Sequence, residues 1–198
     1  MSELKETRLD GGVVYDGPFL KVERDRIRLP DGKESHREFI RHPGAVVILP
    51  LLPDGRILLE RQFRYPNGKV FIEFPAGKID PGEDHLDCAK RELVEETGYT
   101  AAKWRFVCTI HNAIAYSDEH LEIFVAEDLT HGEQQLDAGE FLELFSVTLP
   151  ELLDLVRRGE ITDVKTIIGT FWLEKILAGD WTPARSRCST CCWQHCCR

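Results

Sequence analysis

Three glutamates in the middle of the chain, Glu92, Glu95 and Glu96, could together bind a metal ion. They belong to residues 84–97, which contain no proline or glycine and are predicted to form a helix. Residues three and four apart are neighbours on a helix, so the glutamates share a stripe and repel by roughly 0.2–0.5 kcal/mol per pair. Mg²⁺ takes oxygen ligands and bridges carboxylates to substrate phosphates. We therefore interpret the stripe as a magnesium site that also accepts Mn²⁺; the alternative is a solvated acidic helix face.

The predicted helix has sequence signals at both ends. A loop rich in glycine and proline precedes it, at residues 77–83, and Gly98 follows it as a residue suited to a helix C-cap. The apolar positions are spaced by three or four residues, which predicts a buried face distinct from the acidic stripe. That buried face consists of Leu86, Ala89, Leu93 and Thr97.

Residues 77–99 resemble the signature of the Nudix hydrolase family. The pattern is a glycine, five residues, Glu83, seven residues, and the run Arg-Glu-Leu-Val-Glu-Glu-Thr-Gly-Tyr. Tyr99 is the one departure, since an aliphatic residue is usual there. The resemblance implies an α/β fold, an α/β/α sandwich with a mixed sheet. It also implies a pyrophosphohydrolase acting on a nucleoside diphosphate linked to another group.

The same resemblance implies roles for the signature residues. Glu83 is expected to pair with Arg91 and to fix the loop against the helix, as outer partners do at metal sites. The implied metal ligands are Glu92, Glu95, Glu96 and the backbone carbonyl of Ala76.

Two segments ahead of the signature resemble ADP-ribose pyrophosphatases: residues 62–64, Gln-Phe-Arg, and residues 73–77, Glu-Phe-Pro-Ala-Gly. In that subgroup Arg64 would contact substrate phosphate, a task that suits its planar fork of donors. Glu73 would lie near the substrate. The alternatives are a surface charge at a strand end for Arg64 and an exposed strand residue for Glu73.

A loop after the signature, at residues 111–117, is followed by Asp118 and Glu119. By resemblance, Glu119 is the candidate general base; the alternative is an ordinary loop carboxylate. Ile114 stands where ADP-ribose pyrophosphatases often carry a proline.

The composition of the chain limits the kinds of binding partner that we expect. The chain has 198 residues and a formal charge of −9, which argues against non-specific nucleic-acid binding. No apolar run approaches the roughly 20 residues needed to span a bilayer, and we expect a cytoplasmic protein with a small-molecule nucleotide substrate. The preferred substrate is ADP-ribose, cleaved to AMP and ribose 5-phosphate. The alternatives are GDP-mannose, an oxidised nucleoside triphosphate, or a nucleotide-sensing regulator without catalysis.

Three regions are expected. Residues 1–43 are predicted to form a small antiparallel sheet, to which the resemblance assigns homodimer formation, and residues 44–180 the Nudix hydrolase domain. Residues 181–198 hold five of the seven cysteines. We interpret this tail as disordered or as the product of an altered reading frame; a zinc site is the alternative.

Two details of the packing are also predicted. Residues 45–52 form a continuous apolar run, which predicts a buried strand. The turn predicted at residues 53–55 would join this strand in a hairpin to residues 56–63. Residues 163–178 are predicted to form a helix. Its expected apolar face consists of Val164, Ile167, Ile168, Phe171, Trp172, Ile176 and Leu177.

Overall fold

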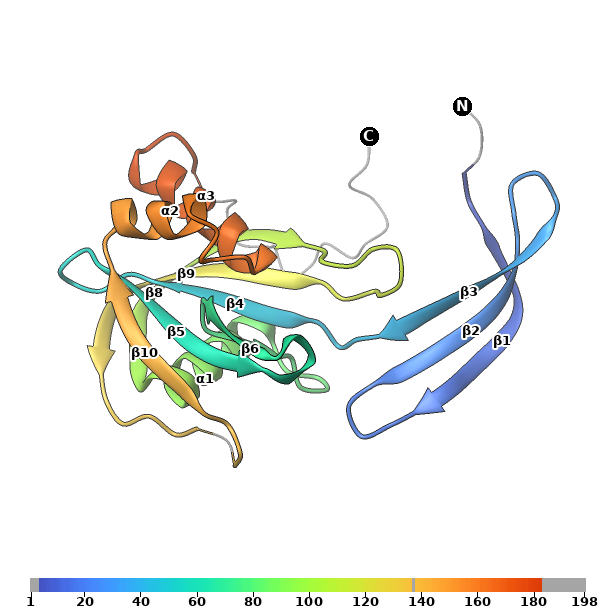
Figure 1. The fold of residues 1–198 in the computed structure, drawn as a ribbon, viewed down its shortest axis with the longest axis horizontal. Helices are drawn as coiled ribbons and strands as arrows, with labels where there is room; N and C mark the ends of the chain where they lie inside the picture. Colours follow the sequence, from blue (N-terminus) through green and yellow to red (C-terminus); the bar gives the residue numbers. More distant parts are fainter. Residues whose placement is uncertain (1–3, 137, 183–198) are drawn as a thin grey trace. The chain divides into compact units, whose positions relative to one another are not determined.

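The computed structural model describes residues 4–136 and 138–182, so the predicted tail lies outside the described residues from residue 183 onward. The chain divides into two compact units (Figure 1). Within the described residues, the first comprises residues 4–44 and 111–120, and the second residues 45–110, 121–136 and 138–182. No helix in the described part of the chain is long and apolar enough to cross a membrane.

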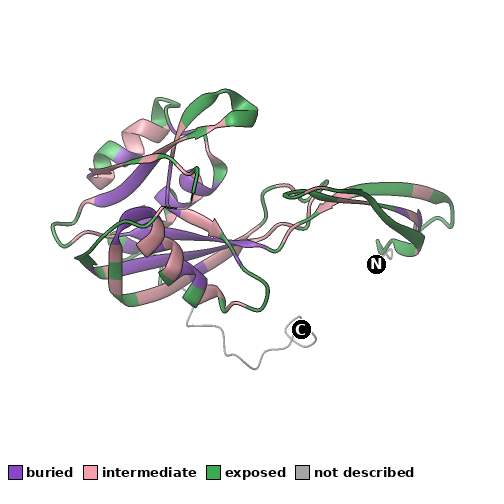
Figure 2. Cartoon of the chain, turned by 90° about the horizontal axis from the view of Figure 1, so that it is seen from below, coloured by how far each residue is buried: buried purple, intermediate pink, exposed green. Residues whose placement is uncertain are grey.

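The first unit is built on the predicted antiparallel sheet. Its strands are β1 (Thr7–Asp16), β2 (Lys21–Arg28) and β3 (Glu34–Arg41), in the order β1-β2-β3. The segment 111–120 is fastened to the end of β3, where Ile40 N–H donates to the Tyr116 carbonyl at 2.8 Å. Most side chains of these strands are at least partly exposed (Figure 2).

The second unit contains two sheets and the helices. The mixed sheet has the order β7-β4-β9-β8, in which β4 and β9 are parallel and the other pairs antiparallel. Its strands are β4 (Ala45–Pro50), β7 (Ala76–Lys78), β8 (Tyr99–Ile110) and β9 (Leu121–His131). The second, antiparallel sheet is β10-β5-β6, with β5 (Ile57–Arg64), β6 (Lys69–Glu73) and β10 (Leu142–Val147); a short 3₁₀ turn, η1 (Tyr65–Asn67), joins β5 to β6. The helices are α1 (His85–Thr97), α2 (Leu149–Arg157) and α3 (Val164–Leu177).

Strands β4 and β9 carry apolar residues on both faces because both faces of the mixed sheet are covered. On one face Val46 and Phe124 pack in a cluster with Leu93 of α1. On the other face Val47 and Ile123 pack in a cluster with residues of the second sheet, α2 and α3. The predicted α/β/α sandwich with a mixed sheet and a small antiparallel N-terminal sheet is confirmed.

The predicted hairpin of β4 and β5 is wrong. The turn itself forms, with Gly55 N–H donating to the Leu52 carbonyl at 2.9 Å. The two strands nevertheless belong to different sheets and share only an isolated bridge between Leu51 and Ile57. Strand β5 instead uses both of its own edges in the second sheet, where it pairs with β10 and β6.

The apolar face predicted for α3 is also partly wrong. Val164, Phe171 and Leu177 are 46–49% exposed. Gly169 instead faces the core, where an added Cβ would lie 2.7 Å from Leu49 Cδ2. A helix this close to the sheet needs small or hydrogen-bonded residues at the contact, which a count of apolar residues cannot detect. The buried residues of α3 are Lys165, Thr166, Gly169, Thr170, Leu173 and Ile176.

Candidate active site

Helix α1 is fixed in register at both ends, as the sequence predicts. The Asp84 side chain caps the first turn by accepting from Leu86 N–H at 2.9 Å. Gly98 ends the helix in the left-handed conformation, at φ 72°, and its N–H donates to the Val94 carbonyl. Ala89 and Leu93 are fully buried. This packing determines which way the acidic residues of α1 point.

Glu96 lies against the backbone of Ala76. It is 4% exposed, and its Oε2 accepts from Ala76 N–H at 3.0 Å. Burial, then the charges of Glu60, Glu92 and Glu140, raise the pKa of Glu96 well above its ordinary value. The structure thus brings together two of the predicted ligand residues, Ala76 and Glu96, in surroundings that favour a bound cation.

Glu92 joins this arrangement through Gly77. A Cβ added at Gly77 would lie 1.8 Å from the carboxylate carbon of Glu92, so that carboxylate rests directly on the glycine backbone. Glycine is therefore required here for close approach, not for an unusual φ. Glu92 and Glu96 consequently lie at adjacent backbone positions, Gly77 and Ala76.

The predicted pairing of Glu83 with Arg91 is present. Arg91 donates Nε to Glu83 Oε1 and Nη2 to Glu83 Oε2, both at 2.9 Å. These bonds are the main reason that the pKa of Glu83 falls to about 2. Arg91 Nη1 also donates to Glu92 Oε1 at 2.8 Å and to Glu95 Oε2 at 2.9 Å. Arg91 thus holds the loop and two of the predicted ligands.

Arg91 binds both Glu92 and Glu95, and the carboxylates of α1 do not converge on a single point in this structure. Among the residues that the structure describes, no group of three His, Cys, Asp or Glu side chains is arranged to hold a metal ion. The donor set still fits a hard divalent cation, since it consists of carboxylate and carbonyl oxygens. A buried carboxylate oxygen without a hydrogen-bond partner, on Glu60, adds to that fit.

Arg64, whose side chain is partly exposed, forms an ion pair with the buried Glu73. Arg64 donates Nε to Glu73 Oε1 at 2.7 Å and Nη2 to Glu73 Oε2 at 2.8 Å. Glu73 is 2% exposed, which excludes the exposed-strand alternative. Burial alone would raise the pKa of Glu73, but the hydrogen bond from Arg64 and the charge of Lys165 outweigh it and lower the pKa. Glu73 is therefore ionised and holds the guanidinium of Arg64 in place.

Two residues near this ion pair, Lys165 and Glu60, were not predicted from the sequence as residues of the site. Lys165, buried at the start of α3, donates to Glu73 and also to Asp163 Oδ2, the latter at 3.0 Å. Glu60 is 1% exposed in β5, directly opposite Glu73 in the strand register. Burial, then the charge of Glu73, raises the pKa of Glu60 to about 8. The available signal was a carboxylate following three consecutive apolar residues in a predicted strand.

Glu119, the candidate base, lies in the first unit, whereas the predicted metal ligands lie in the second. Its N–H donates to Ser117 Oγ at 3.1 Å, and its carboxylate accepts from Asn112 Nδ2 at 3.4 Å. His42 Nε2 lies 3.6 Å from its Oε1. The side chain is thus held within its own unit, and its catalytic role stays a prediction.

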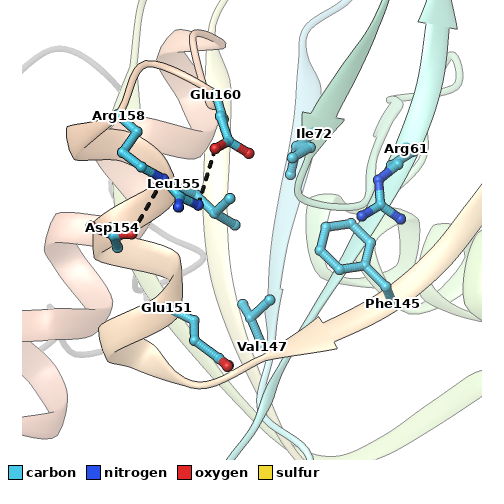
Figure 3. Close-up of a pocket in the computed structure, with 9 residues that line it drawn as sticks. All are labelled: Arg61, Ile72, Phe145, Val147, Glu151, Asp154, Leu155, Arg158 and Glu160. Carbon is cyan, nitrogen blue, oxygen red and sulfur yellow. Dashed lines mark ion pairs between the residues drawn. The ribbon is translucent and has the colours of Figure 1, made fainter.

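A hollow of about 390 Å³ lies between α2 and the second sheet (Figure 3). Arg61 stacks on Phe145 at 3.9 Å, and Arg158 is paired with Asp154 and Glu160. The hollow contains none of the predicted site residues. It is lined by Arg61, Ile72, Phe145, Val147, Glu151, Asp154, Leu155, Arg158 and Glu160.

Comparison with known families agrees with the geometry at α1. The NUDIX domain model matches residues 40–167, and the nucleoside diphosphate sugar hydrolase N-terminal domain matches residues 6–40. The chain therefore belongs to the Nudix family, and it is a Nudix hydrolase.

Its relatives are similar over most of their length. An ADP-ribose pyrophosphatase of Bacillus subtilis (strain 168) is 37% identical over 176 residues, covering 88% of this chain and 95% of the relative. A methanol dehydrogenase activator of Bacillus methanolicus is 36% identical over 163 residues, covering 81% and 88%. A crystal structure of an ADP compounds hydrolase matches with a TM-score of 0.81 at 27% identity, covering 88% of this chain and 95% of that one.

The contact between Gly77 and Glu92 leads to a prediction. Gly77→Ala should leave the melting temperature nearly unchanged, because the clashing atoms are the end of a flexible side chain. Glu92 must then move off the backbone, and we expect hydrolase activity to fall by roughly 10–100-fold, the usual effect of disturbing support around a metal site. Steady-state kinetics and thermal unfolding measure both quantities. Gly12→Ala, where an added Cβ meets nothing within 4 Å, is the matched control; full activity of Gly77→Ala would contradict the proposed ligand position.

Proposed function

We propose that this protein hydrolyses the diphosphate bond of ADP-ribose, giving AMP and ribose 5-phosphate. The single observation that carries the proposal is the meeting of Glu96 and Glu92 with the backbone of Ala76 and Gly77. The contact of both carboxylates with the backbone at the start of the signature loop supports a cation site there. The similarity to an ADP-ribose pyrophosphatase over 88% of the chain supports the choice of substrate.

The residues that would hold Mg²⁺, or Mn²⁺ in its place, are Glu92, Glu95, Glu96 and the Ala76 carbonyl. When bound, such ions neutralise phosphate charge and lower the pKa of a coordinated water. Arg91 keeps Glu92 and Glu95 on one side of α1 through its Nη1. Its bonds to Glu83 hold the preceding loop against the helix. That loop follows β7 (Ala76–Lys78), so the same bonds help to position β7.

Arg64 is proposed to bind a phosphate of the substrate. Its Nε and Nη2 are bonded to Glu73, and the side chain is still 42% exposed, so Nη1 can donate to a phosphate oxygen. Lys165 donates to Glu73 and is itself held by Asp163. A guanidinium fixed in this way loses less conformational entropy when it binds an anion. Glu73 then acts as a positioning residue through Arg64.

The rest of the molecule is assigned on the same basis. We propose residues 44–180 as the catalytic domain and residues 1–43 as the homodimer contact, supported by Val13, Val14 and Tyr15, which are 50–56% exposed on β1. Light scattering that gives a monomer mass would contradict the dimer.

A cytoplasmic location is supported by Cys88 and Cys108, which are free thiols.

A turnover screen tests the proposed substrate. We expect ADP-ribose to give the highest kcat/KM in a set that includes GDP-mannose and an oxidised nucleoside triphosphate, and EDTA to abolish turnover. GDP-mannose is the chief rival, since a GDP-mannose pyrophosphatase of Salmonella paratyphi B is 31% identical over 147 residues. Faster turnover of GDP-mannose would overturn the substrate. Nucleotide binding without turnover in either Mg²⁺ or Mn²⁺ would favour a sensing role.

A further inference from the structure

Glu60 is a buried carboxylate that the proposed mechanism does not use. It is 1% exposed, and its Oε2 has no hydrogen-bond partner among the residues the structure describes. Buried polar side-chain atoms in native proteins are nearly always paired, and an unpaired buried carboxylate costs free energy of folding. The position therefore requires a partner that the described chain does not supply.

The basic groups near Glu60 are already engaged. Arg64 binds both oxygens of Glu73, and Lys165 binds Glu73 and Asp163. Glu73 is thus satisfied by two cations, while Glu60, its direct neighbour across β5 and β6, has none bonded to it. Arg64 cannot turn to Glu60 without breaking its two bonds to Glu73, and Lys165 cannot turn without breaking its bonds to Glu73 and Asp163.

Glu60 also lies close to the predicted metal ligands in the strand register: it is opposite Glu73, three residues before Ala76, whose N–H donates to Glu96 at 3.0 Å. It shares a face of β5 with Gln62, whose Nε2 donates to Glu140 at 3.1 Å. After burial, the charge of Glu60 is the largest contribution that raises the pKa of Glu96, ahead of Glu92 and Glu140. Carboxylates from β5 and α1 therefore meet in one buried region.

We propose that Glu60 is a further carboxylate of the divalent-cation site, contributed by β5 and acting on the cation or on one of its coordinated waters. The inference rests on the proposed function, because it assumes that Glu96 binds the same cation. Mg²⁺ keeps several waters in protein sites, which gives a buried acceptor such as Glu60 a donor to bind. Glu73 cannot take this role, since Arg64 and Lys165 occupy its oxygens.

The rival explanation is that Glu60 is only a structural residue of the second sheet. The two explanations differ in how the protein responds to metal. A residue of the cation site changes metal affinity and the stabilisation that metal confers, because a ligand that binds only the folded state stabilises it in proportion to its affinity. A structural residue changes stability equally with and without metal.

The test is Glu60→Gln, with Mn²⁺ as the probe. Electron paramagnetic resonance counts free Mn²⁺ in a titration of the purified protein, and thermal unfolding is measured in EDTA and in Mn²⁺. We expect the Kd for Mn²⁺ to rise about 10-fold or more. The melting temperature in EDTA should not fall, and the increase caused by Mn²⁺ should shrink. Glu143→Gln, a 73% exposed carboxylate of β10, is the matched control and should change neither.

Two further variants make the outcome decisive. Glu60→Asp keeps the charge on a shorter side chain and should give an affinity between those of the wild type and Glu60→Gln. An unchanged Mn²⁺ affinity in Glu60→Gln, or in Glu60→Asp should Glu60→Gln not fold, overturns the inference. Glu96→Gln separates the two proposals: if it binds Mn²⁺ like the wild type, the proposed metal site itself fails. If Glu96→Gln loses Mn²⁺ while Glu60→Gln keeps it, only the role of Glu60 is lost.

Discussion

Replacing Glu96 by glutamine is expected to reduce kcat by about 10³-fold while the protein still folds. The change keeps the size of the side chain and removes the charge beside Ala76. A metal-bound phosphate group gains several kcal/mol of charge stabilisation in the transition state, and each 1.36 kcal/mol corresponds to a factor of ten in rate. Turnover of ADP-ribose at saturating Mg²⁺ measures the loss. Near-full activity of Glu96→Gln would show that Glu96 is not a metal ligand.

The same variant should be as stable as the wild type, or more stable, in EDTA. Burial and the neighbouring carboxylates raise the pKa of Glu96 in the folded state above its ordinary value of 4.5. A raised pKa means that the folded state loses stability as the pH rises above that ordinary value, because the group then ionises in the unfolded state while it stays protonated in the folded state. The advantage of glutamine should therefore be present near pH 8 and fade as the pH falls toward 4.5. A variant less stable than the wild type at pH 8 in EDTA would contradict this account.

The signature region could be predicted because its determinants are local. The cap at Asp84, the left-handed Gly98 and the apolar spacing through Leu93 all act within one helix, so periodicity alone fixes its faces. The pairing of Glu83 with Arg91 also followed, because the family pattern ties the loop to the helix. Burial of Glu96 against Ala76 adds a tertiary contact to this local frame.

The errors and omissions concern contacts between elements. The strand β5 follows a turn suited to a hairpin, yet both of its edges pair with β10 and β6 in the second sheet. Lys165 is buried because Glu73, 92 residues earlier in the chain, is its partner. Apolar periodicity in a sequence predicts that lysine and glutamate lie on the surface. Lys165 and Glu73 are buried because they pair with each other in the folded chain, which periodicity cannot predict.

Glu119 is the carboxylate whose chemistry most needs testing. We predict that the catalytic base is Glu119, which follows a loop, and not a glutamate of α1. Carboxylates bound to a metal ion are poor bases, since the cation holds their lone pairs and lowers their pKa. Glu119 is instead held by neutral or weakly basic neighbours, Asn112 at 3.4 Å and His42 at 3.6 Å. Neither of these two neighbours carries the permanent charge of an arginine or a lysine.

The neighbouring Asp118 provides a matched control. Arg41 Nη1 donates to it at 2.7 Å and His42 N–H at 2.9 Å. Burial would raise the pKa of Asp118, but the hydrogen bonds from Arg41 and from His42 N–H, together with the charge of Arg41, lower it, which makes Asp118 a weaker base. Asp118→Asn should therefore reduce kcat much less than Glu119→Gln. Equal losses in the two variants would indicate that loop order, and not a base, is being measured.

Glu119→Gln is expected to lower kcat by ~10²–10⁴, the usual contribution of general-base catalysis, with little change in KM. We further expect water to attack the adenosine-side phosphorus of ADP-ribose. Hydrolysis in ¹⁸O-labelled water, with both products analysed by mass spectrometry, should then place the label in AMP. Label in ribose 5-phosphate would refute this point of attack without bearing on the base. An unimpaired Glu119→Gln enzyme would remove Glu119 as the base, whichever phosphorus carries the label.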